Sequence, residues 1–446
     1  MAASSIETEW IRATEAEHAP WILTGFDRAT LHMVLRGTWI FKAQLDVVRL
    51  KESLASILSL YPHLAGRLVE GKEVRCNNAG VPFSVTSRPD IRVSDIQTNH
   101  NLANAFADRP KTGKAKKGKE PGLKVRVTHL LDGSVLSVCC MHALMDGNGF
   151  YSMVSNWARC QTGRSFPKPL LKQSLMPKPA SGPKYDAIRR AREAGWHRYS
   201  LLKLFRLLLS PSLFSGKPCR RAPAVFFPLR LCEELKQSAM AASEGTALTF
   251  NDVLCAHLSK MCARLIGHAD GVVCRQGIVV DTRQRIPELP PNFVGNGSSC
   301  FSGAAFRVGE PLEKIAENTH NSLAPYLKKP SPLLAKETLL ALELIAHRAL
   351  YLPYDFTASL GPSPTTFFIN SFLRLPVYDV DFGVEGSPIR PVLVIPHDSP
   401  DQILIWPAPP EANGIEIYFG GPLGNALEKQ DKEGAWWKEM LNRQSG

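Results

Sequence analysis

Two consecutive apolar segments in the first half of the chain predict a β-hairpin. Residues 123–130 (LKVRVTHL) alternate apolar and polar side chains, so one face of this strand is expected to meet solvent. Residues 134–141 (SVLSVCCM) are almost continuously apolar, as in strands covered on both faces. The Asp132-Gly133 pair between them is typical of a tight hairpin turn.

Further elements are expected before this hairpin. An extended segment is predicted over residues 30–35, and a helix over 44–60, where apolar residues recur at helical spacing. Pro62 ends this helix, because proline cannot continue it and restricts the residue before it. Short strands are predicted at 74–76 and 81–83, separated by a turn.

The second half of the chain alternates helices with strands. A stretch rich in Pro, Gly, Ser and Lys at 167–221 is predicted to be a long connection that contains one helix. Thr249 or Asn251 is expected to cap a later helix, and strands are predicted at 277–281 and 367–372. This alternation predicts an α/β fold with a mixed β-sheet flanked by helices.

The length of 446 residues is too great for one ordinary core and predicts two domains. We place the first domain at 1–180, a crossover linker at 181–222 and the second domain at 223–446. The composition, 44% hydrophobic and 21% charged, is that of a globular protein.

The net charge of +12 does not by itself predict a polyanionic partner. Residues 111–119 are typical of a solvated, mobile loop and contain no aromatic residues for base stacking, so nucleic acid is not expected as a partner. A basic segment at 199–209 fits an interfacial amphipathic helix, but such helices more often pack on a domain. Membrane contact is therefore not expected.

Targeting and cysteine patterns point to the cytoplasm. The N-terminal region has no basic stretch followed by apolar residues, and no apolar segment is long enough to cross a bilayer. The ten cysteines lack C-x-x-C pairs, so we expect reduced thiols and no metal site.

The strongest candidate for chemistry is the hexapeptide His142-Ala143-Leu144-Met145-Asp146-Gly147, which lies between the strand at 134–141 and a helix predicted at 150–158. A histidine at a strand end suits a general base, because its ordinary pKa of about 6.5 leaves it mostly neutral at cytosolic pH. The alternative is a core histidine followed by a turn that Asp146 and Gly147 close.

Further segments accompany this hexapeptide along nearly the whole chain. They are Tyr61-Pro62-His63-Leu64-Ala65-Gly66-Arg67-Leu68, Trp157-Ala158, Asn251-Asp252 with Ala256-His257-Leu258, Asp281-Thr282-Arg283-Gln284-Arg285, Gly295-Asn296, and Leu375-Pro376 through Asp381-Phe382-Gly383. Together they resemble the BAHD-type, coenzyme A-dependent acyltransferases, especially the hydroxycinnamoyltransferases. That family is related in fold to chloramphenicol acetyltransferase and to peptide-synthetase condensation domains.

The resemblance implies a two-domain fold of the chloramphenicol acetyltransferase type, with the active site in an interdomain channel. It implies a monomeric O- or N-acyltransferase of secondary metabolism that uses acyl-CoA as co-substrate and binds no other cofactor. His142 would deprotonate an acceptor hydroxyl or amine in a direct ternary complex. Asp146, the other catalytic residue, would be held by Arg283, and Gly147 would be structural.

A second family motif, Asp-Phe-Gly-Trp-Gly, is altered here to Asp381-Phe382-Gly383-Val384-Glu385-Gly386. By resemblance, Asp381 and Gly383 would keep a structural role on the CoA side. Val384 cannot donate the hydrogen bond that the family's tryptophan can give. An oxyanion donor is worth about 2–4 kcal/mol, so another donor would be needed.

Three residues are implied to bind substrates: Asn370, Ser371 and Arg374. Ser371 stands where a hydroxyl commonly lies along the acyl-CoA channel. Arg374 resembles the arginine with which members acting on shikimate or quinate hold the acceptor carboxylate, since a guanidinium matches a carboxylate bidentately. An exposed or salt-bridged arginine is the alternative.

Two other functions stay open. A catalytically silent relative that binds CoA or acts as a scaffold would also tolerate the altered motif. A condensation-type enzyme would take its acyl group from a carrier protein, although such enzymes usually have a second histidine where Met141 stands here.

Overall fold

The computed structural model describes residues 6–14, 18–98, 102, 105–178, 182–198, 224–243, 245–353, 363–383, 392–393, 402–420, 423–424 and 426–427. The chain forms two compact units. The first consists of Met1–Ala180, Thr282–Ser298 and Arg374–Pro396, and the second of Ser181–Asp281, Ser299–Leu373 and His397–Gly446.

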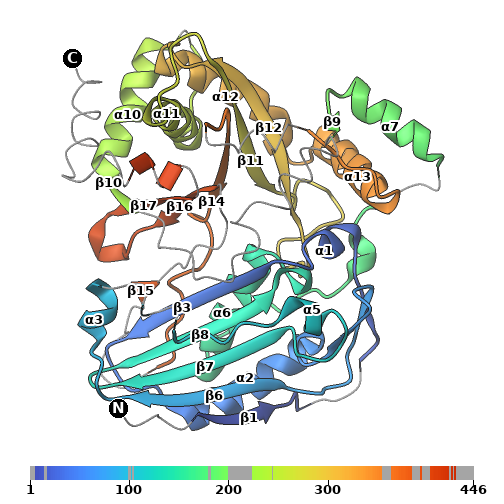
Figure 1. The fold of residues 1–446 in the computed structure, drawn as a ribbon, viewed down its shortest axis with the longest axis vertical. Helices are drawn as coiled ribbons and strands as arrows, with labels where there is room; N and C mark the ends of the chain where they lie inside the picture. Colours follow the sequence, from blue (N-terminus) through green and yellow to red (C-terminus); the bar gives the residue numbers. More distant parts are fainter. Residues whose placement is uncertain are drawn as a thin grey trace. The chain divides into compact units, whose positions relative to one another are not determined.

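A six-stranded sheet forms the centre of the first unit within the described ranges (Figure 1). In spatial order its strands are β1 (Glu7–Ile11), β6 (Val81–Arg88), β7 (Leu123–Leu130), β8 (Ser134–Met141), β3 (Val34–Phe41) and β15 (Val392–Leu393). Neighbouring strands are antiparallel except β6 and β7. The predicted hairpin is confirmed, since β7 and β8 pair antiparallel with Val125 opposite Val138.

Two helices, α2 (Val47–Leu60) and α6 (Gly147–Gln161), pack on each other and cover one face of this sheet (Figure 1). Helix α2 is capped by Asp46, which accepts a hydrogen bond from a backbone N–H, and ends before Pro62 as predicted. Helix α6 begins three residues earlier than predicted. Asp146 caps it through the Gly149 N–H, so Gly147 opens a helix instead of closing a turn.

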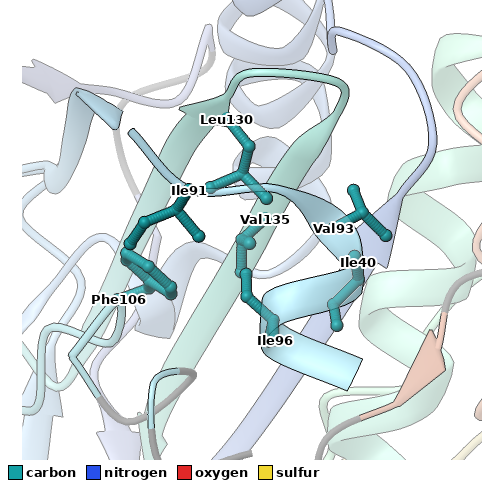
Figure 2. Packing of buried hydrophobic residues seen from close by; sticks show 7 residues of the cluster. All are labelled: Ile40, Ile91, Val93, Ile96, Phe106, Leu130 and Val135. Carbon is teal, nitrogen blue, oxygen red and sulfur yellow. The ribbon is translucent and has the colours of Figure 1, made fainter. Parts of the chain in front are cut away.

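The opposite face of the sheet is covered near the β7–β8 turn by helix α3 (Val93–Thr98) and its neighbours (Figure 2). The cluster consists of Ile40, Ile91, Val93, Ile96, Phe106, Leu130 and Val135. Covered in this way, β8 is buried along its whole length, as its apolar sequence predicted. Thr128, predicted on a solvated face of β7, is instead fully buried, with its hydroxyl 3.0 Å from that of Thr86.

A second, three-stranded sheet in this unit has the order β2 (Trp21–Ile22), β5 (Glu73–Arg75) and β4 (Arg67–Val69). The strands predicted at 74–76 and 81–83 therefore form, but β5 and β6 belong to different sheets. A short 3-10 helix, η1 (Pro62–Leu64), connects α2 to β4.

Two segments differ from the sequence prediction, and a third lies outside the residues that the structure describes. The strand predicted at 30–35 begins only at Val34, because Thr30 still caps the end of helix α1 (Gly25–Ala29). The predicted mobile loop at 111–119 contains the helix α5 (Thr112–Ala115), in which Ala115 is fully buried. The basic segment at 199–209 lies outside the described residues.

The second unit has a six-stranded sheet of its own in the described ranges. Its order is β10 (Ala224–Pro228), β17 (Gly414–Phe419), β16 (Gln402–Pro407), β14 (Thr366–Ser371), β11 (Val273–Asp281) and β12 (Ser298–Arg307). Strand β14 runs parallel to β11 and β16, so the sheet is mixed, as predicted.

Three helices pack against one another and against this sheet: α10 (Leu229–Ala242), α11 (Phe250–Leu265) and α12 (Leu312–Leu327) (Figure 1). Of the two predicted caps of α11, Thr249 is the one used. Within the described part of the connection expected at 167–221 lies the helix α7 (Lys184–Glu193), which packs on α13 (Pro332–Ala346). Strands β9 (His197–Arg198) and β13 (Tyr351–Leu352) pair beside them.

The division of the chain differs from the contiguous domains expected from sequence, because two late segments return to the first unit. Residues 374–396 add strand β15 to the edge strand β3. Residues 282–298 bond to the turn that begins at His142. No helix within the described ranges has both the length and the apolarity to cross a bilayer.

Candidate active site

His142 opens a 3-10 turn, η2 (His142–Leu144), directly after strand β8. Its backbone is held at both ends: its N–H donates to the Met33 carbonyl at 2.9 Å, and its carbonyl accepts from Asn296 Nδ2 at 2.9 Å. The ring atom Nδ1 is buried and has no hydrogen-bond partner among the described residues. The structure thus places the imidazole at a strand end, where the sequence predicted it.

The environment of His142 favours a neutral ring. Burial lowers the pKa of His142 below its ordinary value. The polar groups of its own backbone, the carboxylate of Asp146, the side chain of Asn296 and the carboxylate of Asp27 oppose that shift only in part. Burial also lowers the pKa of the neighbouring His32, and a positive charge on His142 lowers it further. A neutral imidazole is the form that can accept a proton.

Asp146, which is 2% exposed, is turned toward Arg283. Arg283 donates from Nη1 to Oδ2 at 2.8 Å and from Nη2 to Oδ1 at 3.0 Å. The N–H groups of Gly149 and Gly297 and the hydroxyl of Ser298 donate to the same carboxylate at 2.9, 3.0 and 3.1 Å. Burial alone would raise the pKa of Asp146, but the charge and hydrogen bonds of Arg283 outweigh it and hold the pKa below its ordinary value.

Arg283 is as buried as its partner, at 2% exposure. Besides the carboxylate, it donates from Nε to the Phe293 carbonyl at 2.9 Å and from Nη2 to the Gly295 carbonyl at 3.1 Å. The pairing with Asp146 that the resemblance implied is therefore present. Both side chains are fully engaged in fixing the turn that carries His142.

The sequence prediction missed Asp27, which lies beside the same turn. Asp27 is fully buried near the start of helix α1, where Oδ2 accepts from the N–H and the hydroxyl of Thr24, both at 2.8 Å. Its Oδ1 accepts from Asn296 Nδ2 at 2.7 Å. The Thr24-x-x-Asp27 spacing of a capping box was the available signal. For Asn296, the sequence offered only its place in the Gly295-Asn296 segment that contributes to the family resemblance.

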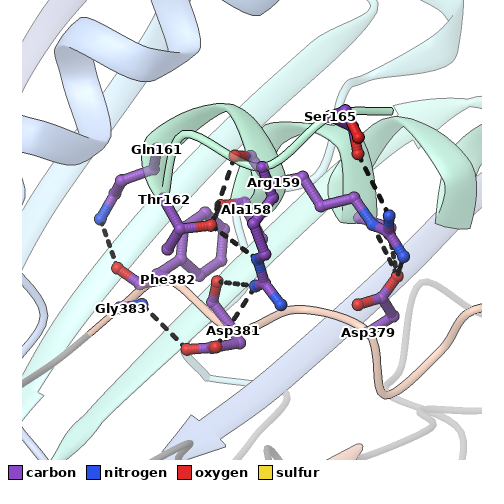
Figure 3. Close-up of polar contacts among 11 residues, drawn as sticks. Ala158, Arg159, Gln161, Thr162, Ser165, Asp379, Asp381, Phe382 and Gly383 are labelled. Atoms are coloured by element: carbon purple, nitrogen blue, oxygen red, sulfur yellow. Dashed lines mark hydrogen bonds and ion pairs between the residues drawn. The ribbon is translucent and has the colours of Figure 1, made fainter. Parts of the chain in front are cut away.

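The altered second motif is bonded to the end of helix α6 (Figure 3). Arg164 Nη2 lies 3.3 Å from Asp381 Oδ2, and Asp381 Oδ1 accepts from the Gly383 N–H at 2.9 Å. Gly383 has a φ of +67°, and a Cβ there would lie 2.7 Å from Thr162 Cγ2, so glycine suits this position. Both predicted structural residues therefore contribute to the shape of this turn. Val384 lies outside the described residues.

Neighbouring residues anchor the motif more deeply (Figure 3). Phe382 packs edge-on against Trp157, with ring centroids 5.0 Å apart, and its carbonyl accepts from Gln161 Nε2 at 2.8 Å. Asp379 accepts from Arg159 Nη2 at 2.7 Å. Helix α6 thus carries the His142 turn at its N-terminal end and this segment at its C-terminal end.

The predicted substrate-binding residues are divided between the two units. Asn370 and Ser371 end strand β14 in the second unit, where Asn370 is half-buried and Ser371 is exposed. Arg374 is exposed and begins a segment of the first unit. The structure therefore gathers the predicted base, its carboxylate and its arginine in one unit and places Asn370 and Ser371 in the other. No group of three or more His, Cys, Asp or Glu side chains in the described parts of the chain could hold a metal ion.

Comparison with known proteins decides the family. The model of the Transferase family matches residues 23–422. The chain belongs to this family of BAHD acyltransferases. Such enzymes use acyl-CoA as co-substrate, so the chain is an acyl-CoA-dependent acyltransferase, and the predicted family, fold class and co-substrate are confirmed.

Several plant enzymes are similar to this BAHD acyltransferase along most of its length. Tryptamine hydroxycinnamoyltransferase 2 from Oryza sativa subsp. japonica is 27% identical and covers 89% of each chain. Deacetylvindoline O-acetyltransferase from Catharanthus roseus is 26% identical over 78% of this chain and 75% of its own. Hydroxycinnamoyl-CoA:5-hydroxyanthranilate N-hydroxycinnamoyltransferase HHT1 from Avena sativa is 24% identical and covers 77% of each chain.

Solved structures share the fold. Vinorine synthase aligns with a TM-score of 0.66 and 17% identity, covering 93% of this chain and 94% of its own. F. graminearum TRI101, complexed with coenzyme A and T-2 mycotoxin, aligns with a TM-score of 0.69 and 16% identity, covering 93% and 98%. The first condensation domain of the CDA synthetase is less similar, with a TM-score of 0.51.

Proposed function

We propose that this BAHD acyltransferase transfers an acyl group from acyl-CoA directly to the hydroxyl or amine of a small-molecule acceptor, with His142 as general base. The observation that carries the proposal is the half-buried imidazole at the end of β8, whose pKa is lowered by desolvation while Asp146 is bound to Arg283. A neutral histidine held in this way can take a proton at neutral pH.

The reaction balances without a covalent acyl-enzyme. Because Nδ1 is buried, Nε2 of His142 is the atom that takes the proton from the acceptor. The acceptor oxygen or nitrogen forms a bond to the thioester carbonyl carbon, and a tetrahedral oxyanion develops. Its collapse breaks the carbon–sulfur bond, and the CoA thiolate takes the proton back from His142. The products are the acylated acceptor and free CoA.

Asp146 and Arg283 act on this reaction through position. The carboxylate accepts from Arg283, Gly149, Gly297 and Ser298, and thereby fixes the far end of the turn that begins at His142. A base must stand within hydrogen-bonding distance of the proton it removes, so a fixed turn contributes directly to the rate. The relatives' names include both O- and N-acylating enzymes, which is why the acceptor is stated as a hydroxyl or an amine.

The test is thiol release from a panel of acyl-CoAs mixed with pooled alcohols and amines, with products identified by mass. Wild type is compared with His142→Ala and with the matched control His129→Ala, whose histidine lies at the opposite end of the same hairpin. We expect acceptor-dependent release from wild type and from His129→Ala, and none from His142→Ala even though it still binds CoA.

Three other outcomes of this assay would contradict the proposal. Turnover by His142→Ala at the wild-type rate would refute the general base. CoA binding by wild type without turnover would indicate a silent binding protein. Release that occurs only with an acylated carrier protein would indicate a condensation-type enzyme.

A further inference from the structure

We infer that Asn296 and Asp27 are positioning residues for His142, because a hydrogen-bonded bridge runs from the buried Asp27 carboxylate through the Asn296 amide to the His142 carbonyl. The inference rests on the proposed role of His142 and adds two residues to the groups that determine the rate. All three residues belong to the first unit.

Both protons of the Asn296 side-chain amide take part in hydrogen bonds. Nδ2 has two protons and lies 2.7 Å from Asp27 Oδ1 and 2.9 Å from the His142 carbonyl oxygen. Both partners are acceptors, so the nitrogen and not the oxygen of the amide must point at them. The backbone N–H of Asn296 also donates to Asp27 Oδ1, at 3.2 Å. With 4% exposure, Asn296 has little freedom to rotate.

The two carboxylate oxygens of Asp27 accept hydrogen bonds from different groups. Oδ2 accepts from the N–H and hydroxyl of Thr24 and from Gln173 Nε2, which completes the cap of helix α1. Oδ1 accepts only from Asn296 among the described residues. Burial raises the pKa of Asp27, and no ion pair offsets that cost within the described ranges. The cap alone does not account for the second oxygen.

A capping box of the same kind elsewhere in the chain supplies a comparison. In helix α11, Asp252 Oδ2 accepts from the N–H and hydroxyl of Thr249, at 2.8 and 2.7 Å. Its further partner is the side chain of His320 on helix α12. The capping motif therefore recurs without a connection to a catalytic turn, so the bond from Asp27 to Asn296 is a feature of the site and not of the cap.

The segment from Gly295 to Ser298 holds both ends of the His142 turn by separate bonds. Asn296 holds the His142 carbonyl, whereas Gly297 and Ser298 hold Asp146. Losing the Asn296 amide would therefore remove one of the two backbone hydrogen bonds of His142, leave its bond to the Met33 carbonyl, and leave the Asp146 end of the turn bound. Displacement of a catalytic group by about 1 Å can cost about 100-fold in rate.

The test compares Asn296→Ala with Gln173→Ala, which removes a donor from the capping oxygen of Asp27 but none from the bridge. We expect kcat per folded molecule of Asn296→Ala to fall about 10- to 100-fold, with both KM values and the CoA dissociation constant within about twofold of wild type. Gln173→Ala should keep kcat within about twofold. A purely structural role would lower the melting temperature and leave kcat per folded molecule unchanged.

A double variant tests the bridge itself. Asp27→Asn and Asn296→Ala act on one connection, so their combined loss of kcat should not exceed the larger single loss by more than about twofold; losses that multiply would overturn the inference. If Asn296→Ala does not fold, Asn296→Ser, which retains one donor, replaces it and should show a smaller loss of kcat. Failure of Asn296→Ser to fold would also overturn the inference.

The two proposals fail in different ways. If His142→Ala is inactive and Asn296→Ala has the wild-type kcat, the bridge is wrong and the general base stands. If His142→Ala remains active, the proposed base is wrong whatever the Asn296 variants show.

Discussion

Replacing Arg283 by methionine would leave the Asp146 carboxylate buried without its cation. Both side chains are 2% exposed, and the guanidinium donates two hydrogen bonds to Asp146 and one each to the carbonyls of Phe293 and Gly295. Removing one partner of a buried pair typically costs about 3–5 kcal/mol. Three other donors to Asp146 remain, so we expect a loss of about 3 kcal/mol in the free energy of unfolding, at the lower end of that range.

The measurement is urea unfolding followed by tryptophan fluorescence, with acyl transfer recorded on the same samples. Arg283→Lys is the matched control, because it keeps the charge but loses the planar fork, and it should lose about 1–2 kcal/mol. The double variant Asp146→Asn, Arg283→Met should lose less than the sum of its parts, since each change then removes the other's unpaired charge.

The pH dependence of this loss follows from the lowered pKa of Asp146. A carboxyl whose pKa is lower in the folded state stabilises the fold above its ordinary pKa, and that stabilisation is lost as the pH falls through the lowered value. The difference in the free energy of unfolding between wild type and Arg283→Met should therefore be largest at neutral pH and become smaller as the pH falls into the acid range. A loss below about 1 kcal/mol at neutral pH would refute the reasoning from the buried pair.

Three further expectations concern the same unit and the acceptor. Because the pKa of His142 is lowered, kcat/KM should be constant down to about pH 6.5 and fall only below it. A midpoint above 6.5 in a pH–rate profile would contradict a neutral base with a lowered pKa. Gly383→Ala should lower the free energy of unfolding by about 1–2 kcal/mol, because φ is +67° there and the new Cβ would contact Thr162. Gly163→Ala is the control, since Gly163 has a φ of +68° but open space around it, and its loss should reflect the cost of the backbone conformation alone. Equal losses in urea unfolding would mean that the contact with Thr162 relaxes freely. Arg374→Ala should raise the KM of an acceptor that bears a carboxylate and leave the KM of acyl-CoA unchanged, and an equal KM for that acceptor in steady-state kinetics would exclude the contact.

Local rules over a few residues were enough to predict much of the fold. The hairpin of β7 and β8 follows from an alternating run, an apolar run and an Asp-Gly pair between them. Helix α2 ends before Pro62, and helix α11 begins directly after its cap Thr249, because a missing N–H and a capping hydroxyl act within one turn of the helix. The hexapeptide at His142 could likewise be singled out, since a strand and a helix flank it in sequence.

The composition of the site was decided by tertiary structure. Arg283 meets Asp146 across 137 residues and Asn296 meets Asp27 across 269, and no local pattern encodes which distant segments become neighbours. The same holds for Thr128, whose polar side chain suggested a solvated face until the segment around α3 covered the sheet. By itself the sequence determined the local elements, the candidate base and the family resemblance. The buried partners that hold the base, and its lowered pKa, exist only after the chain has packed, because burial and long-range pairing are properties of the folded chain.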